Sequence, residues 1–115
     1  MISTNSFLQG VFAFTGTGLT DFGPIDPSLS HQVPEGTICQ ALYFRGGNSS
    51  DELIVVALVR DGQVMRLFPI GARSDVHVPL RVVEDLDGGS VLTLSIAAPA
   101  GTVGTVVVDL GLVEH

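Results

Sequence analysis

Apolar positions along this chain fall in short runs that glycine, proline and polar turn residues separate. The runs are rich in Val, Ile, Leu, Thr and Phe, and the chain contains 14 glycines and 6 prolines. Short runs of this composition are typical of β-strands, and signals for helices are nearly absent. The pattern predicts strands at Gly10–Phe14, Thr37–Arg45, Leu53–Arg60, Gln63–Pro69, Asp75–Val83, Ser90–Ala97 and Gly104–Leu112.

The spacing of these runs indicates the fold class. Turn signals recur about every 8 to 12 residues, which is the pattern of an antiparallel sandwich or jelly roll. A chain of 115 residues is the size of one compact domain. We therefore expect an all-β fold in which residues 1–115 form a single antiparallel β-sandwich, jelly-roll-like, with seven to eight strands and little or no helix.

The strongest turn signal is Asp61-Gly62, between two apolar runs. Both residue types tolerate the positive φ angles of a two-residue type I′ hairpin loop, and such a loop fixes the strand register. The predicted pairs are Val59 with Val64, Leu58 with Met65, Ala57 with Arg66, Val56 with Leu67 and Val55 with Phe68.

Both faces of this predicted hairpin are apolar. Paired residues share a face, so Val56, Leu58, Met65 and Leu67 lie on one side and the other predicted partners on the opposite side. In a two-layer sandwich only one face of each sheet meets the core. The second face therefore predicts an oligomer interface made of Val55, Ala57, Val59, Val64, Arg66 and Phe68.

Other segments refine this arrangement. In the run from residue 104 to 112, Val106, Val108 and Leu110 share one face and Val107 lies on the other.

The segment Asp75–Val83 alternates cleanly between inward and outward residues. Its inward residues are Val76, Val78, Leu80 and Val82. Pro79 predicts that the segment lies at a sheet edge, because proline cannot donate a hydrogen bond to a neighbouring strand.

Residues 15–36 contain three prolines and show no usable period. We expect a long irregular segment on the surface, which is unusual in a small domain and is more often functional than idle. An alternative to an oligomer interface is that this segment folds back over the second sheet face and places Leu19, Phe22, Ile25 and Leu29 on it. The sequence leaves both possibilities open.

Composition and charge limit the partners. Hydrophobic residues make up 45% of the chain and charged residues only 15%, against about 25% in an average domain. The formal net charge is −7, and the five basic residues are all arginine. We therefore expect neither nucleic acid nor an anionic membrane as a partner, because both are bound through clustered basic residues.

The start of the chain and the cysteine content suggest where the protein resides. The N-terminal run has no basic residue and is interrupted by Gln9 and Gly10, so we expect no signal peptide. The single Cys39 excludes an intramolecular disulfide. We expect a cytoplasmic protein, or a virion component if a phage encodes it.

Motifs of catalysis and cofactor binding are missing from the sequence. His31, His77, His115 and Cys39 do not lie at ligand spacings, which predicts no metal site. The stretch Glu84–Ser90 lacks the closing glutamate of a calcium loop, and Thr15–Gly18 lacks the helix that a phosphate loop needs. We therefore expect no cofactor and a protein that is not an enzyme.

One polar group is a candidate recognition patch. Tyr43, Arg45, Asn48 and Asp51 fall at the end of one strand and in the loop after it, and an aromatic ring beside a guanidinium is typical of binding hot spots. Strand alternation places Ile38, Leu42 and Phe44 on one face and Cys39, Ala41, Tyr43 and Arg45 on the other. The alternative is that Arg45 only pairs with Asp51 or Glu52.

These observations favour three functions in order. The first is a non-catalytic structural protein that forms a symmetric homo-oligomer or decorates a larger particle such as a virion capsid. The second is a module that binds a carbohydrate, that is a glycan, or a small ligand through the recognition patch. The third is an accessory subunit of a larger enzyme complex.

Overall fold

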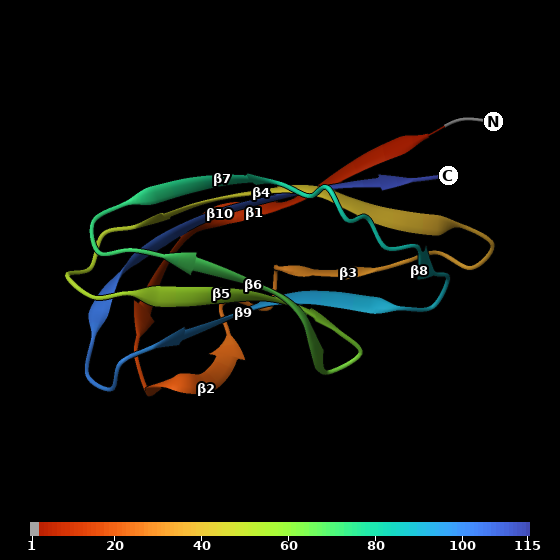
Figure 1. Cartoon of the computed structure of the whole chain (residues 1–115). Coiled ribbons are helices and arrows are strands. Elements are labelled where there is room, and N and C mark those ends of the chain that lie inside the picture. The colour runs from red at the N-terminus through yellow and green to blue at the C-terminus, as the bar shows by residue number, and fades with distance from the viewer. Residues whose placement is uncertain (1–2) are drawn as a thin grey trace.

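The computed structural model describes residues 3–115, and two layers of strands pack face to face (Figure 1). No helix occurs among these residues, so none that could span a membrane is present there. The ten strands are β1 (Thr4–Thr15), β2 (Gly18–Pro24), β3 (Ser30–Gln32), β4 (Ile38–Asn48), β5 (Ile54–Arg60), β6 (Gln63–Ile70), β7 (Asp75–Pro79), β8 (Leu86–Asp87), β9 (Val91–Ala98) and β10 (Val103–Glu114).

The strand order is that of a jelly roll. Sheet A runs β1-β10-β4-β7 with β8 beside β4, and sheet B runs β2-β9-β5-β6 with β3 beside β9. Among the eight longer strands, the first pairs with the last, the second with the next to last, and so on inward to the β5–β6 hairpin. Successive nested pairs alternate between the two sheets, which is how one long hairpin rolls into a sandwich.

The predicted fold class is confirmed, with ten strands where seven to eight were expected. The additional strands are the two-residue β8 and two strands within residues 15–36, which were predicted to be irregular. That segment contains β2 and β3, and both pair with β9. The prediction failed there because β2 breaks its register between Gly18 and Gly23, which removes the alternation that identifies a strand.

The β5–β6 hairpin has the predicted turn but another register. Asp61 and Gly62 both have positive φ, and Val59 pairs with Val64. A β-bulge then places two residues, Met65 and Arg66, where one was predicted, so Leu58 pairs with Arg66 and Val56 with Phe68. The four predicted pairs beyond Val59–Val64 are therefore wrong by one residue.

This shift moves Phe68 into the core. Its side chain is only 2% exposed and stacks on Phe44 of the opposite sheet, with ring centroids 4.3 Å apart. The surrounding core comes from both sheets, chiefly Ile54, Val56, Leu58, Ile70, Leu92, Leu94, Val106, Val108 and Leu110. Leu29 and Ile25 also pack against it, so these two residues do not cover the outer face of a sheet.

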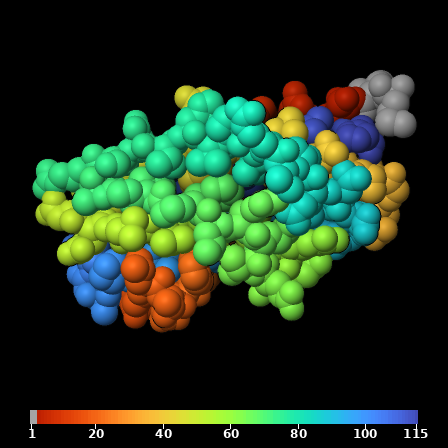
Figure 2. All heavy atoms as spheres, viewed as in Figure 1, coloured from red at the N-terminus to blue at the C-terminus, as the bar shows by residue number. Residues whose placement is uncertain are grey.

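Arg66 binds the segment between β7 and β8 instead of standing free on the outer face. Its guanidinium Nη2 lies 2.8 Å from a Glu84 carboxylate oxygen and donates a hydrogen bond to the Val82 carbonyl at 3.0 Å. Figure 2 shows the segment after β7 lying against β6 on this side of the molecule. The contact of Arg66 with Val82 and Glu84 thus joins β6 to the segment after β7 along this side of the sandwich.

The predicted edge position of the segment Asp75–Val83 is confirmed. β7 is the last strand of sheet A, but it ends at Pro79. Val76, Val78 and Leu80 pack against the core, as alternation predicts, whereas Val82 is exposed. Residues 80–83 leave the strand to reach Arg66.

Candidate functional site

A second β-bulge decides which side chains of β4 face outward. Ala41 pairs with Leu112 and Tyr43 with Gly111, so Leu42 is an extra residue with no partner on β10. Cys39 and Ala41 consequently face the core together with Phe44, and Leu42 is exposed. The prediction that Cys39 and Ala41 share a face with Tyr43 and Arg45, and Leu42 with Phe44, was therefore wrong.

Tyr43 and Arg45 do lie together on the outer face of sheet A. The register aligns Arg45 with Asp109 of β10 on one side and with His77 of β7 on the other. The Tyr43 hydroxyl donates a hydrogen bond to Asp109 at 3.1 Å, and the Tyr43 ring meets the His77 ring edge to face at 6.1 Å. Burial and the Asp109 carboxylate raise the pKa of the Tyr43 hydroxyl.

Gly111 determines the orientation of Tyr43. A Cβ atom at this position would lie 2.0 Å from the tyrosine ring, so only glycine allows the ring to cross β10 toward Asp109. Gly47 has no such restriction, since a Cβ there would only touch Val107 at 3.6 Å.

A shallow groove of about 510 Å³ runs over this part of the sheet. Arg45, Asp75, His77 and Asp109 supply its polar lining, and Gly46, Gly47, Val76 and Val107 complete it. Among residues 3–115, no carboxylate lies within ion-pair distance of the Arg45 guanidinium. The groove thus offers a guanidinium, an imidazole and two carboxylates to a polar ligand.

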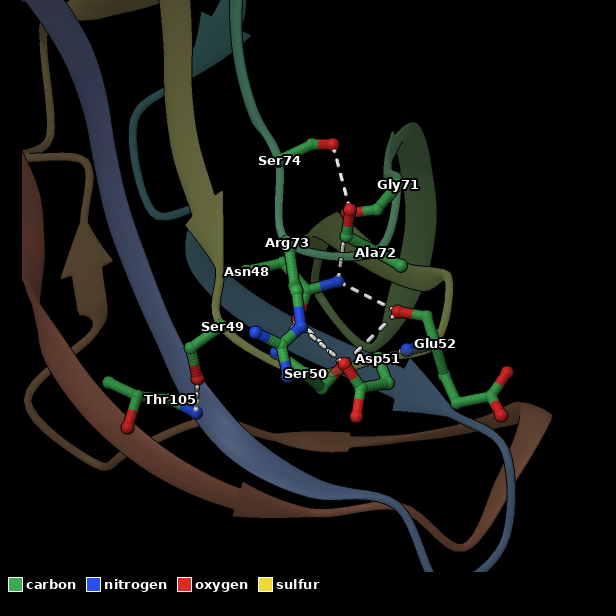
Figure 3. Close-up of polar contacts among 10 residues, drawn as sticks. All are labelled: Asn48, Ser49, Ser50, Asp51, Glu52, Gly71, Ala72, Arg73, Ser74 and Thr105. Carbon is green, nitrogen blue, oxygen red and sulfur yellow. Dashed lines mark hydrogen bonds and ion pairs between the residues drawn. The ribbon is translucent and has the colours of Figure 1, made fainter.

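Asn48 and Asp51 do not join this patch. Asn48 is buried, and its Nδ2 donates to the Glu52 carbonyl at 2.8 Å and the Gly71 carbonyl at 3.1 Å (Figure 3). Asp51 instead pairs with the Arg73 guanidinium, which lowers the pKa of its carboxyl. The predicted patch is therefore corrected to Tyr43 and Arg45 with His77 and Asp109, and the alternative pairing of Arg45 with Asp51 is wrong.

The other half of the same outer face is apolar. Phe7 and Val11 of β1 are 52% and 66% exposed, and Val103 and Val107 of β10 are exposed beside them. Val11 pairs directly with Val107 in the sheet. We call Phe7, Val11, Val103 and Val107 the apolar strip.

The apolar strip adjoins an unprotected sheet edge. β1 is the first strand of sheet A, and its 12 residues, TNSFLQGVFAFT, include neither proline nor any charged side chain. Natural proteins protect edge strands with lysine, proline, bulges or short length, because an open edge pairs with other chains.

The strands at the other three sheet edges carry such protection. β7 has five residues and ends at Pro79, β6 contains a bulge and Pro69, and β2 is irregular and ends at Pro24. An open edge is therefore a specific property of β1.

Most residues of the interface that was predicted on the hairpin are buried or paired within the subunit. Phe68 is in the core and Arg66 binds Glu84, while Ala57 and Val59 are buried within the subunit. Val64 is 48% exposed and Val55 is half-buried, and Leu67, which was expected in the core, is 57% exposed. The prediction rested on a register that the bulge at Met65 changes.

Sequence reasoning found only residues 10–14 of β1 and missed its position at a sheet edge, and it did not place His77 and Asp109 at the site. One signal for the length of β1 was available, since its 12 residues contain no charged side chain and no proline, but its edge position follows only from the strand order. His77 and Asp109 lie 32 and 64 positions from Arg45, and only the strand order brings them to it.

Comparison with known proteins identifies the fold and no more. No model of a protein family and no curated protein matches the chain. Among solved structures, it is similar to the CBM36-1 domain of a multidomain xylanase from the hindgut metagenome of Trinervitermes trinervoides, with a TM-score of 0.58 and 16% identity over 96% of each chain. It is also similar to a chain of infectious bursal disease virus, Gt strain, with a TM-score of 0.53 and 11% identity over 97% of this chain and 32% of that one.

Proposed function

We propose that this protein is a non-catalytic structural protein that forms a homo-oligomer through the β1 edge of sheet A. The observation that carries the proposal is the unprotected β1 edge beside the apolar strip. Pairing of β1 with β1 of a second copy joins two A sheets into one, because antiparallel pairing about a two-fold axis matches the same surface on both subunits.

Two properties of the surface support this proposal. The pairing satisfies the free N–H and C=O groups of β1, and the strips of two copies become neighbours on one continuous face. The low charge density fits an interface, because the centre of an interface is depleted of charged side chains. The likeness in fold to a chain of infectious bursal disease virus is compatible with a role in a larger particle.

Light scattering on the purified chain tests the proposal. We expect an oligomer at micromolar concentration, and we expect Val11→Lys to convert it into a folded monomer, because a lysine on each edge strand repels its counterpart. Val64→Lys is the matched control, since it adds the same charge to an exposed valine of the other sheet.

Three results would argue against assembly through β1. A wild-type monomer at micromolar concentration contradicts self-association, and co-purification with an unrelated chain favours an accessory subunit instead. Dissociation by Val64→Lys but not by Val11→Lys places the interface on the hairpin.

The groove beside Arg45 supports a second candidate, binding of a carbohydrate or another small polar ligand. Its guanidinium and carboxylates suit hydroxyl groups, and the fold is shared with a carbohydrate-binding module of a xylanase. The chain has a single tyrosine and no tryptophan, and Tyr43 is already engaged by Asp109 and His77. A stacking platform for sugar rings is therefore small, and we rank this candidate second.

A glycan array separates the two candidates. If the groove binds a glycan, Arg45→Ala removes the signal without changing the melting temperature, while Asp51→Ala, outside the groove, keeps it. An array on which the wild-type protein gives no signal contradicts this candidate, as does equal loss in both variants.

A further inference from the structure

Three potential metal ligands meet at one end of the sandwich, far apart in the sequence. His31 comes from β3 of sheet B, whereas Cys39 of β4 and Glu114 of β10 are register partners in sheet A. One ligand atom of each residue lies within 4.8 Å of the other two. The bulge at Leu42 creates this cluster, because it turns Cys39 toward the core.

The cluster is unusual for its surroundings. Glu114 is the only charged residue among residues 3–115 that is buried in the subunit, and Cys39 is fully buried. A buried carboxylate is costly unless it is paired or coordinates a metal. Nε2 of His31 is in direct contact with a Glu114 carboxylate oxygen, so one partner is present.

We propose that His31, Cys39 and Glu114 form a binding site for a divalent metal ion of the zinc class. Imidazole nitrogen, thiolate sulfur and carboxylate oxygen are the ligands of protein zinc sites, and three protein ligands leave a fourth position for water. Tetrahedral zinc holds its ligand atoms about 3.5 Å apart. The site therefore needs the Cys39 sulfur to approach and the His31–Glu114 contact to open slightly.

The site is rigid and can be reached by an ion. Leu29 and Val33 on either side of β3 are buried, which fixes the backbone that carries His31. The His31 side chain is itself 21% exposed, so it connects the cluster to solvent. The ion would join the two sheets, because His31 belongs to one and its partners to the other.

Binding must release a proton. A free cysteine thiol is protonated at neutral pH, whereas a cysteine that binds a metal ion does so as thiolate. The ion replaces the thiol proton, which passes to solvent, and the sulfur binds as thiolate.

Metal titration of the chelator-treated chain tests this site. We expect one Co²⁺ per chain with a thiolate-to-metal charge-transfer absorption, and a melting temperature that rises with Zn²⁺ concentration. Both effects should vanish in Cys39→Ser and in His31→Gln. They should persist in His77→Gln, which removes a histidine of the groove instead.

The variants keep the proposal falsifiable even if one of them fails to fold. His31 lies at the surface of the cluster, so His31→Gln leaves the core intact, and circular dichroism checks each variant without metal. Two results would overturn the metal site. One is a wild-type chain without the Co²⁺ charge-transfer absorption, and the other is stabilisation by Zn²⁺ that survives in His31→Gln. The cluster would then be only an ion pair between His31 and Glu114.

Discussion

Phe68 and Phe44 stack at the centre of the sandwich, one from each sheet. Replacing Phe68 by alanine removes this contact and leaves a cavity between the sheets. We expect Phe68→Ala to lower the free energy of unfolding by about 3–5 kcal/mol in a urea titration. Leu67→Ala, at the neighbouring position, which is 57% exposed and outside the apolar strip, serves as the control and should change the free energy of unfolding far less. Equal losses would place Phe68 outside the core.

Cys39 makes stability depend on pH in alkaline solution. The pKa of its thiol rises from 9.0 in a free cysteine to about 11 in the fold, so between these values the folded chain holds a proton that the unfolded chain loses. Stability is therefore complete below pH 9 and decreases as pH rises toward 11, by up to about 3 kcal/mol.

A comparison of metal-free wild-type protein with Cys39→Ser measures this decrease. The wild-type free energy of unfolding should fall more steeply with pH, because serine does not ionise in this range. Tyr43 contributes equally to both proteins. If the free energies of unfolding of the two proteins fall equally with pH, the raised pKa of the Cys39 thiol is contradicted.

Individual residues were predictable where alternation is unbroken. Val106, Val108 and Leu110 face inward and Val107 outward, as the sequence of β10 predicts. Predictions failed at Phe68 and Cys39, because each lies beyond a bulge that shifts the alternation by one position. No residue type signals either bulge.

At the scale of elements, Asn48 ties the β4–β5 connection to the β6–β7 connection. Its amide donates to carbonyls in both, and its Oδ1 accepts from the Ser50 amide at 2.9 Å. We expect Asn48→Ala to cost about 2–4 kcal/mol of unfolding free energy, because several buried polar groups lose their partner.

Thermal denaturation of Asn48→Ala beside Asp51→Ala checks this role. Asp51 lies in the same loop, but its pair with Arg73 is exposed, so its loss should leave the melting temperature almost unchanged. A melting temperature of Asn48→Ala equal to that of the wild type would show that water replaces these hydrogen bonds.

Strands that pair regularly were found from the sequence, with ends that differ by a few residues. The Asp61-Gly62 hairpin was identified through its turn chemistry. β2 was not, because only its two ends pair with β9. The edge position of β7 followed from Pro79, whereas the edge position of β1 depends on the order of the whole sheet.

At the scale of the whole molecule, the open edge, the apolar strip and the groove all belong to sheet A. The sequence predicted an exposed apolar surface correctly in kind, since the chain has few charges to distribute. It placed that surface on hairpin residues of which Ala57, Val59 and Phe68 are buried, because both β5 and β10 are rich in valine and only packing distinguishes them. The metal cluster likewise depends on bringing β3, β4 and β10 together.

Amide hydrogen exchange along β1, resolved residue by residue at micromolar concentration, tests assembly through this edge most directly. In an isolated subunit only the amides that bond to β10 are protected, so protection alternates along Thr4–Thr15. Edge pairing predicts protection of consecutive amides through the middle of β1, lost in Val11→Lys. Alternating protection in the wild-type protein, unchanged by Val11→Lys, would contradict it.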